Sequence, residues 1–401
     1  MEKLFVGIDV SKDDFKASLV DYRNNCLASG LTFEYTRASM EQFVVEVNHF
    51  ASKENADAVY GMESTGIYHL SLYQHLLDAG ASVYVFNSLE VHGFKNRVRK
   101  IKTDRIDSEC IAEALLLLGD FELPHSPNPR LEELREINRS RNRVVGKITE
   151  CKVQVTRDLD VLCPGYSSVF RDDLSPSSIR VMKLAFRKTR FLKASVSELE
   201  SVLRQTMGQT RSFERASVLH ELFASVVVRE SMLNACLLDL HLLIDEYKFL
   251  KSQQERLEKR IEKLVATTNT RLCTIPGIGQ LTAGIMLGEL GSFDRFPSAD
   301  KMVAFAGLDP SISQSGRSFK TGRISKRGSP ILRSALYRAS VSAIRVNPVC
   351  KAFYERSKSR GKPTRVCLVA VARKLLHIAF SVEKNHRDFY VPDHIQVEDT
   401  A

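Results

Sequence analysis

The sequence lacks the features that would indicate a disulfide-rich, zinc-binding, secreted or membrane-spanning protein. Its eight cysteines stand singly, with no Cys-x-x-Cys pair and no cysteine and histidine cluster at zinc-binding spacing. They predict buried thiols in a reducing compartment. No stretch approaches the roughly 18 apolar residues of a membrane span, and the apolar run near the start is too short for a signal peptide. We expect a protein of the cytoplasm or nucleoid with no membrane partner.

The composition is that of a folded protein without internal repeats. Of 401 residues, 43% are hydrophobic and 26% are charged, which is typical of globular chains and argues against a mainly disordered one. The length indicates two or three domains.

Positive charge is concentrated in one block. The formal net charge is +10, but residues 311–374 hold 16 Lys and Arg against a single acid, Glu355, a net of +15. The remainder is therefore at −5. The basic residues stand within helix-like text, which favours a folded surface for a polyanion over an ordinary solvated face, because clustered cations release counterions on meeting a phosphate backbone.

The first 90 residues alternate between strand and helix patterns. Two apolar runs joined by a polar turn predict a hairpin, and more strands and two helices follow. In chain order we expect strands at 4–12, 15–21 and 26–36, a helix at 39–51, a strand at 56–64, a helix at 66–80 and a strand at 82–88. This order predicts an α/β fold with a mixed sheet whose first strands are antiparallel.

The middle of the chain reads as helical. Residues 129–160 are polar and helix-like, and the Ser-rich, basic stretch 164–217 is interpreted as an irregular or helical insertion. A heptad-like apolar seam then predicts a long helix that pairs with another helix, within the chain or across a dimer. The seam consists of Cys236, Leu240, Leu243, Tyr247, Leu250, Leu257, Ile261 and Leu264.

Four acids form a candidate metal site. Asp9 and Glu63 each stand at the end of an expected strand, and Asp104 and Asp107 are three apart on an expected helix, so they share one face. Carboxylates are the ligands of hard divalent cations, and two such ions clamp the oxygens of a phosphodiester displacement. The alternatives are a turn aspartate and a solvated acidic face. The basic run 95–102, which ends at Lys102, and Arg105 are placed to hold a phosphate backbone beside the acids.

A nucleotide-binding interpretation of the same hairpin stays open. Sugar kinases and actin-like ATPases also begin with an Asp-bearing hairpin. They require further Gly-rich phosphate loops, and the sequence has no Walker pattern.

The text IPGIGQLTA has the form of a helix-hairpin-helix. Gly277 and Gly279 let the backbone approach a phosphate, while the amides of the next helix point at it. The alternative is a plain turn between two packed helices.

The densest basic text, residues 305–336, is a candidate nucleophile loop. A serine among glycines and cations can be a nucleophile, since the cations stabilise its alkoxide and the charge that develops on phosphorus. The residues alone do not rank the serines, which are equally suited to ordinary phosphate contacts. The serines are Ser311, Ser313, Ser315, Ser318 and Ser325, and the cations are Arg317, Lys320, Arg323, Lys326, Arg327 and Arg333.

Taken together, these motifs resemble the insertion-sequence-110 family of DEDD transposases, which is related to the Piv-type DNA invertases. The matching motifs are GIDVSK, GMESTGIY, KTDRIDS, IPGIG, FAGLDPS with its following QSG, and GRISKRGSPILRSALY. They occur in the family's order over residues 1–120 and 270–380. The stretch 164–217 departs from the family, because it is longer than in compact members.

The resemblance implies a fold and a chemistry. It implies a RuvC-like, RNase H-fold domain whose acids Asp9, Glu63, Asp104 and Asp107 bind Mg²⁺, with Mn²⁺ as an alternative, and a helical middle that mediates dimerisation. It also implies a C-terminal domain in which Ser315 forms a covalent 5′-phosphoserine, with the acids and the serine contributed by different protomers. Members use a structured bridge RNA from the element.

We therefore expect a bacterial RNA-guided DNA transposase. The expected partners are the element ends and target DNA, a bridge RNA, and copies of the chain in a dimer that forms a tetramer in the synaptic complex. The expected regions are a catalytic domain at 1–125, a helical coiled-coil middle at 126–267, a mainly helical transposase domain with a helix-hairpin-helix at 268–392, and a tail at 393–401. Two rivals remain: a RuvC-like junction endonuclease in which water attacks, and a non-catalytic nucleic-acid-binding protein.

Overall fold

The computed structural model describes residues 2–63, 68–86, 104–118, 128–185, 193–226, 230–315 and 318–391. For residues 104–106, 118, 185, 230, 311–315 and 318–323 it describes the course of the backbone only. The chain divides into two compact units, residues 1–127 and 128–401.

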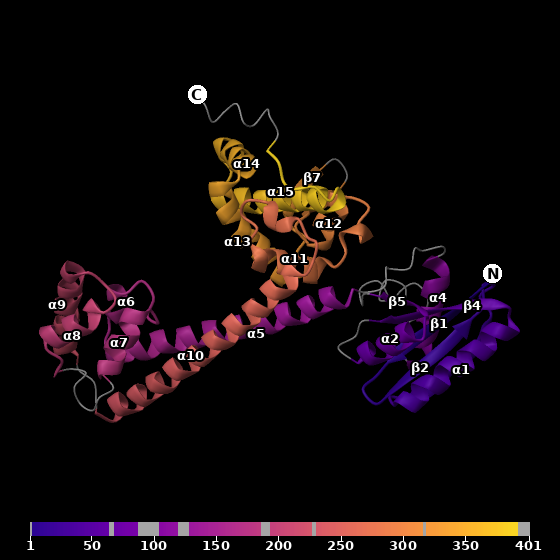
Figure 1. The fold of residues 1–401 in the computed structure, drawn as a ribbon, viewed down its shortest axis with the longest axis horizontal. Helices are drawn as coiled ribbons and strands as arrows, with labels where there is room; N and C mark the ends of the chain where they lie inside the picture. Colours follow the sequence, from indigo (N-terminus) through magenta and orange to yellow (C-terminus); the bar gives the residue numbers. More distant parts are fainter. Residues whose placement is uncertain are drawn as a thin grey trace. The chain divides into compact units, whose positions relative to one another are not determined.

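The first unit contains a five-stranded mixed sheet (Figure 1) in the order β3-β2-β1-β4-β5. Strands β1 and β2 pair antiparallel, as do β2 and β3, whereas β4 and β5 continue parallel to β1. The strands are β1 (Glu2–Val10), β2 (Asp14–Val20), β3 (Cys26–Glu34), β4 (Ala56–Glu63) and β5 (Ser82–Phe86). The predicted mixed sheet with antiparallel first strands is confirmed.

Helices cover both faces of this sheet. On one face, α1 (Arg37–Lys53) and α2 (His69–Asp78) pack on a core that includes Phe15 and Phe43. On the other, Ile111 and Leu115 of α4 (Asp104–Leu118) pack with residues of β1 and β5. Because side chains alternate along a strand, each strand residue belongs to one of these two faces.

The second unit contains a long helical hairpin. Helix α5 (Pro129–Leu162) begins with Asn128 as its N-cap and Pro129 in its first turn, and α10 (Glu230–Ala266) packs along it. The predicted seam of α10 is buried at six of its eight positions. The sequence left open whether this helix pairs with a helix of the same chain or of a second copy. In the structure it pairs with α5 of the same chain.

The insertion between these two helices is a helical lobe that shares a core with the adjoining ends of α5 and α10. The stretch contains α6 (Tyr166–Val169), α7 (Pro176–Ala185), α8 (Val196–Arg204) and α9 (Gln209–Ser225). Tyr166 is fully buried, and a capping box fixes the start of α8, where the Ser195 hydroxyl accepts from the Glu198 amide.

The C-terminal part is mainly helical, as expected, with one hairpin. Its elements are η2 (Leu272–Thr274), α11 (Gln280–Leu290), η3 (Phe293–Arg295), α12 (Ala299–Phe305), β6 (Pro310–Ser315), β7 (Ser318–Ile324), α13 (Pro330–Val346), α14 (Pro348–Ser359) and α15 (Thr364–Lys384). The hairpin β6–β7 was expected to be a loop. Its sequence is rich in Gly, Ser and charged residues, which hides the strand pattern.

Two expectations from the sequence concern membrane spans and the burial of cysteines. No helix in the described ranges is both long and apolar enough to cross a membrane. The expectation that the cysteines are buried holds for six of the eight and is wrong for Cys26 and Cys273, which are exposed.

Candidate functional site

Asp9 lies on the face of the sheet that α4 covers. Phe5 belongs to the α4 core, and a Cβ atom on Gly7 would come within 2.1 Å of the Ser108 carbonyl oxygen. Side-chain alternation then places Asp9 on the same face, near the C-terminal end of β1.

Gly7 is required by this packing. With no Cβ atom, it lets the backbone of α4 approach β1 at Ser108 and Ala112. Gly61 of β4 faces side chains instead, because its Cβ atom would lie 2.7 Å from Cδ1 of Leu115. Gly7 therefore sets the distance between α4 and β1, which bears one of the candidate acids.

Glu63 and Asp107 reach this face as well. Glu63 is the last residue of β4 and is buried, and it lies two positions after Gly61 on the α4 side. Asp107 is buried on α4, beside Ser108, whose hydroxyl is 2.8 Å from that of Ser18 in β2. The structure thus brings three of the four predicted acids to one face of one sheet.

These acids suit a hard cation by their chemistry. Three carboxylates near two strand ends offer the oxygen ligands that Mg²⁺ accepts. Among the described side chains no group of three or more His, Cys, Asp or Glu is close enough to hold a metal ion. The fourth acid, Asp104, begins α4, but its side chain lies outside the described residues, as does that of Arg105, and Lys102 lies outside them altogether.

Lys16 is a residue of this site that the sequence reasoning missed. In the β1–β2 register it is the direct partner of Asp9, so the two side chains lie on the same face. A basic residue therefore stands directly across the hairpin from the candidate metal ligand. The sequence does hold a signal for this pairing, because the ends of the two strands and the length of the turn between them place Lys16 opposite Asp9.

Ser315 lies at the end of the hairpin β6–β7. It ends β6, and its backbone pairs with Ser318, the first residue of β7. The side chains of Ser315, Lys320 and Arg323 lie outside the described residues, and Arg317 lies outside them entirely. The structure thus places two of the candidate serines opposite one another.

Two glycines lock the base of this hairpin. A Cβ atom on Gly307 would lie 1.9 Å from the Arg327 carbonyl oxygen, and one on Gly328 would lie 2.0 Å from the Phe305 carbonyl oxygen. Both have positive φ, at 68° and 106°. Lys326 donates its amide to the Gly307 carbonyl at 3.1 Å. This mutual approach fixes Lys326 and Arg327, both exposed, beside the start of the hairpin.

The guanidinium of Arg333 is hydrogen-bonded to two backbone carbonyl groups. Its Nη1 donates to the Gly328 carbonyl at 2.9 Å and to the Ala306 carbonyl at 3.3 Å, and partial burial lowers the pKa of the guanidinium. In this structure Arg333 thus ties α13 to the hairpin base, and its phosphate contact stays a prediction.

The two glycines of IPGIG have different surroundings. Gly277 has φ of 100°, and a Cβ atom there would lie 2.7 Å from Ala343 of α13, so packing requires the glycine. Gly279 is exposed at the N-cap of α11 with no atom within 4 Å of its Cβ position. The free amides at this end of α11 are the part of the motif open to a phosphate.

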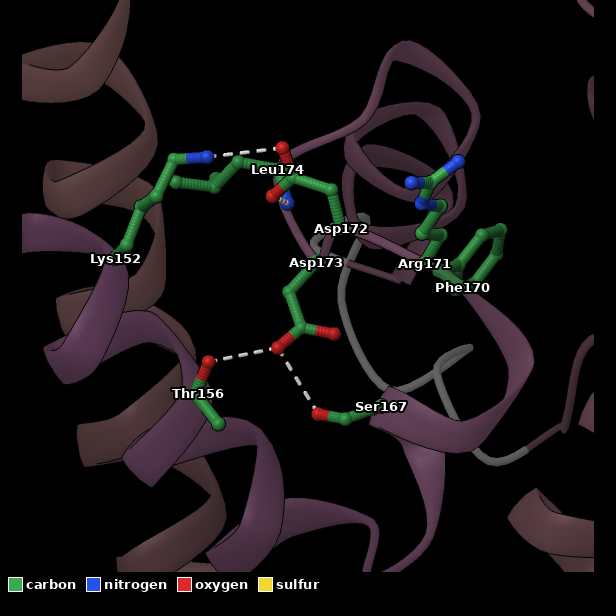
Figure 2. Close-up of a pocket in the computed structure, with 8 residues that line it drawn as sticks. All are labelled: Lys152, Thr156, Ser167, Phe170, Arg171, Asp172, Asp173 and Leu174. Atoms are coloured by element: carbon green, nitrogen blue, oxygen red, sulfur yellow. Dashed lines mark hydrogen bonds and ion pairs between the residues drawn. The ribbon is translucent and has the colours of Figure 1, made fainter. Parts of the chain in front are cut away.

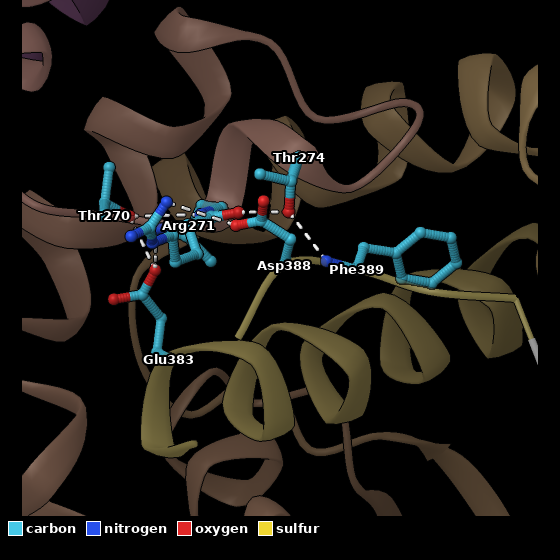
Figure 3. Close-up of polar contacts among 7 residues, drawn as sticks. Thr270, Arg271, Thr274, Glu383, Asp388 and Phe389 are labelled. Carbon is cyan, nitrogen blue, oxygen red and sulfur yellow. Dashed lines mark hydrogen bonds and ion pairs between the residues drawn. The ribbon is translucent and has the colours of Figure 1, made fainter. Parts of the chain in front are cut away.

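A network of polar contacts anchors the segment before this turn (Figure 3). Glu383, near the end of α15, accepts hydrogen bonds from the Thr270 hydroxyl at 2.7 Å and the Arg271 amide at 2.8 Å. Arg271 also pairs with Asp388 at 3.3 Å, and the Phe389 amide donates to the Thr274 hydroxyl at 2.9 Å. The chain after α15 thereby holds the turn in place.

A polar cavity of about 240 Å³ lies where the lobe meets α5 (Figure 2). Lys152 of α5 pairs with Asp172 at 2.9 Å, and one oxygen of Asp173 accepts from the hydroxyls of Thr156 and Ser167. These contacts use both acids to hold the loop after α6 onto α5. We therefore assign this cavity a structural role.

The chain matches two families of known proteins. Residues 6–164 match a family described as transposase, of the DEDD type of IS110, and residues 269–355 match the transposase IS116/IS110/IS902 family. The first region includes Asp9, Glu63, Asp104 and Asp107, and the second includes Ser315.

Relatives in the curated collection carry related names. The pilin gene-inverting protein of Moraxella bovis is 37% identical over 120 residues, 29% of this chain and 37% of that protein. A 43.6 kDa protein of insertion element IS110 in Streptomyces coelicolor is 27% identical over 132 residues, 32% of this chain and 33% of that protein. The match thus spans about a third of the length of both relatives. The transposase for insertion sequence element IS1328 of Yersinia enterocolitica is 25% identical over 383 residues, 94% of this chain and 96% of that protein.

Proposed function

This chain carries the two transposase domains of the IS110 family, and we propose that it is the transposase of an insertion sequence, which cuts and rejoins DNA. The observation that carries the proposal is that Asp9, Glu63 and Asp107 share the α4 face of the sheet, within the region that matches the DEDD family. The strand order β3-β2-β1-β4-β5 supports an RNase H-like fold for this region.

In the proposed mechanism, Ser315 is the nucleophile. Its Oγ forms a bond to phosphorus as the bond from phosphorus to the 3′ oxygen breaks. The proton lost by the serine hydroxyl is balanced, through solvent, by the proton that the 3′ oxygen gains as it departs as a hydroxyl group. The product is a 5′-phosphoserine ester. Since one phosphoester replaces another, resealing by the reverse attack of a 3′ hydroxyl requires no nucleotide cofactor.

The carboxylates and the cations have separate roles in this proposal. Asp9, Glu63, Asp104 and Asp107 would hold Mg²⁺, which supplies charge stabilisation at the scissile phosphate when bound. Lys326 and Arg327, fixed beside the hairpin, would neutralise the DNA backbone together with Arg317, Lys320 and Arg323. The exposed Gly279 end of α11 would receive a further phosphate, as a helix-hairpin-helix does.

A bridge RNA and a second copy of the chain are the proposed partners besides DNA. The net charge of +15 over residues 311–374 supports binding to more than one polyanion. Leu238, Leu242 and Phe249 recur at helical spacing along α10 and are each at least 60% exposed. This apolar stripe, on the side of α10 opposite its seam, supports a dimer formed through the long hairpin.

Trapping of a covalent intermediate tests the proposal. Wild-type protein with Mg²⁺, RNA transcribed from the element and a DNA carrying the element end should give a protein–DNA adduct that resists denaturant. Ser315→Ala should abolish it, whereas Ser318→Ala, at the paired position across the hairpin, should retain it.

Other outcomes identify the rivals. Cleavage without an adduct, unchanged in Ser315→Ala, would mean that water attacks, as in a junction endonuclease. Binding with no cleavage, unaffected by Asp104→Asn plus Asp107→Asn, would mean a non-catalytic binding protein. Loss of the adduct in Ser318→Ala alone would move the nucleophile to Ser318.

A further inference from the structure

A cavity in the C-terminal part lies outside the hairpin and the IPGIG turn. It has a volume of about 290 Å³ and is lined by Phe353 of α14 and by Ala370, Arg373, Lys374 and His377 of α15. The four α15 residues follow one another at helical spacing and so share one face of that helix.

The polar wall of this cavity is cationic. Arg373 is partly buried, and its Nε is buried without a hydrogen-bond partner among the described residues. A buried donor of this kind costs free energy unless it is satisfied by a ligand or by water. Arg373 is one of the residues that line the cavity, so its guanidinium lies beside any anion bound there.

The groups around the cavity leave this positive charge largely uncompensated. His377 pairs with Asp300 of α12 at 3.5 Å, but Asp300 is 82% exposed, so water screens the pair. Cys350 of α14 lies near Lys374 but stays a neutral thiol, because burial raises its pKa to about 11 although Lys374 opposes the rise. Over residues 348–384 the sequence has nine Lys and Arg against two acids.

The other wall is apolar. The ring of Phe353, half-buried against the core of the C-terminal part, and the methyl group of Ala370 face the same cavity. Cations beside an aromatic ring are the combination by which proteins hold single-stranded nucleic acid, with the backbone on the cations and a base or sugar against the ring.

We propose that this cavity between α14 and α15 binds one nucleotide of a single-stranded nucleic acid, with its phosphate on Arg373 and Lys374 and its apolar face on Phe353. The inference deepens the proposed function, on which the identity of the anion as nucleic acid rests. The phosphate chemistry is common to an unpaired RNA segment and to a displaced DNA strand. A paired duplex fits less well, because its bases are stacked and unable to reach the ring.

Charge-matched variants of the full chain test the site. Arg373→Gln and Lys374→Gln remove a cation from the cavity, and Arg365→Gln removes one from an exposed position of the same helix. Binding of labelled 12-nucleotide single-stranded RNA, single-stranded DNA and duplex DNA is measured over a range of salt. We expect each cavity variant to weaken single-strand binding about tenfold and to reduce the salt slope by about 0.7, the value for one phosphate contact on a single strand. Arg365→Gln should change affinity less than twofold.

A substitution of Phe353 tests the contribution of the aromatic ring. Phe353→Leu keeps the apolar volume and removes the ring, and it should weaken single-strand binding several-fold while leaving the salt slope unchanged. Thermal unfolding of each variant separates folding from binding. If Arg373→Gln fails to fold, Lys374→Gln and Phe353→Leu still decide the question.

Each outcome has a distinct meaning. A larger loss for RNA than for single-stranded DNA identifies the guide as the occupant, and the reverse identifies a displaced strand. Equal losses for Arg365→Gln and the cavity variants would overturn the proposed site, as would equal losses on duplex and single strands, while leaving the proposed function intact. Wild-type protein that binds no nucleic acid in any arm would overturn the proposed function itself.

Discussion

Glu383 and Arg271 are 112 residues apart in the chain, yet Oε1 of Glu383 accepts the Arg271 amide hydrogen at 2.8 Å. The same oxygen accepts from the Thr270 hydroxyl. One carboxylate at the end of α15 thus holds the backbone that leads into the IPGIG turn.

Glu383→Ala should destabilise the C-terminal part by about 1–3 kcal/mol, because the amide of Arg271 loses a charged acceptor in a half-buried position. Urea denaturation of the full chain measures the loss. Glu355→Ala, an exposed acid of α14, is the control and should change stability by less than about 0.5 kcal/mol. Equal effects of the two variants would contradict the anchoring role.

Gly7→Ala should disturb the acid-bearing face of the sheet. The new Cβ atom meets the backbone of α4 at 2.1 Å, so α4 must move away from β1, at a cost of about 1–3 kcal/mol. Hydrogen exchange of the β1 and α4 amides in the full chain should show the loosening, and adduct formation should fall with it.

Gly146→Ala is the matched control for this change. Gly146 lies within α5, and its Cβ position has no neighbour within 4 Å, so alanine should stabilise that helix by about 0.5–1 kcal/mol. Unchanged exchange at β1 in Gly7→Ala would mean that the space beside α4 is wider than the structure shows.

Glu258→Gln should weaken the α5–α10 hairpin. Nη2 of the buried Arg141 lies 2.6 Å from Glu258 Oε1. Burial opposes ionisation of Glu258, but hydrogen bonds from Gln254 and Arg141 and the charge of Arg141 outweigh it and lower the pKa. We expect a loss of about 1–3 kcal/mol at pH 7, since the Arg141 guanidinium keeps its burial and loses its counter-charge.

The pH dependence of this loss has a definite sign. A carboxyl group whose pKa is lower in the folded state stabilises the fold above its unfolded pKa, about 4.3, and loses that contribution as the pH falls through the folded value. The difference between wild type and Glu258→Gln in urea denaturation should therefore shrink below about pH 4. Glu133→Gln, which breaks the exposed pair of Glu133 with Arg260, should change stability by less than about 1 kcal/mol throughout.

Much of the first unit follows from the sequence. Alternating apolar residues and the polar turn after Val10 specify β1 and β2. The ends of β1 and β4, next to Asp9 and at Glu63, place these acids without knowledge of the tertiary fold. The neighbour of Asp9 does not follow from periodicity alone. Lys16 becomes its partner through the register of the hairpin, a property of two strands together.

In the second unit, sequence patterns do not predict which elements pack or pair with one another. The seam of α10 specifies that a helix covers it, but Leu240 or Ile261 packs equally well against α5 or against another copy, so the choice depends on contacts across the chain. In β6–β7 the strand pairing depends on the backbone approach of Gly307 to Arg327, for which the sequence has no local period.

The long hairpin also sets a length scale. At 1.5 Å per residue, the 34 residues of α5 form a bar of about 51 Å. The lobe and the C-terminal part have separate buried cores at its two ends. At 3.4 Å per base pair, this bar equals about 15 base pairs of B-DNA. If the proposed function holds and both the lobe and the C-terminal part contact one nucleic acid, α5 separates these contacts by up to that length, and the insertion then extends the reach of the protein along the nucleic acid.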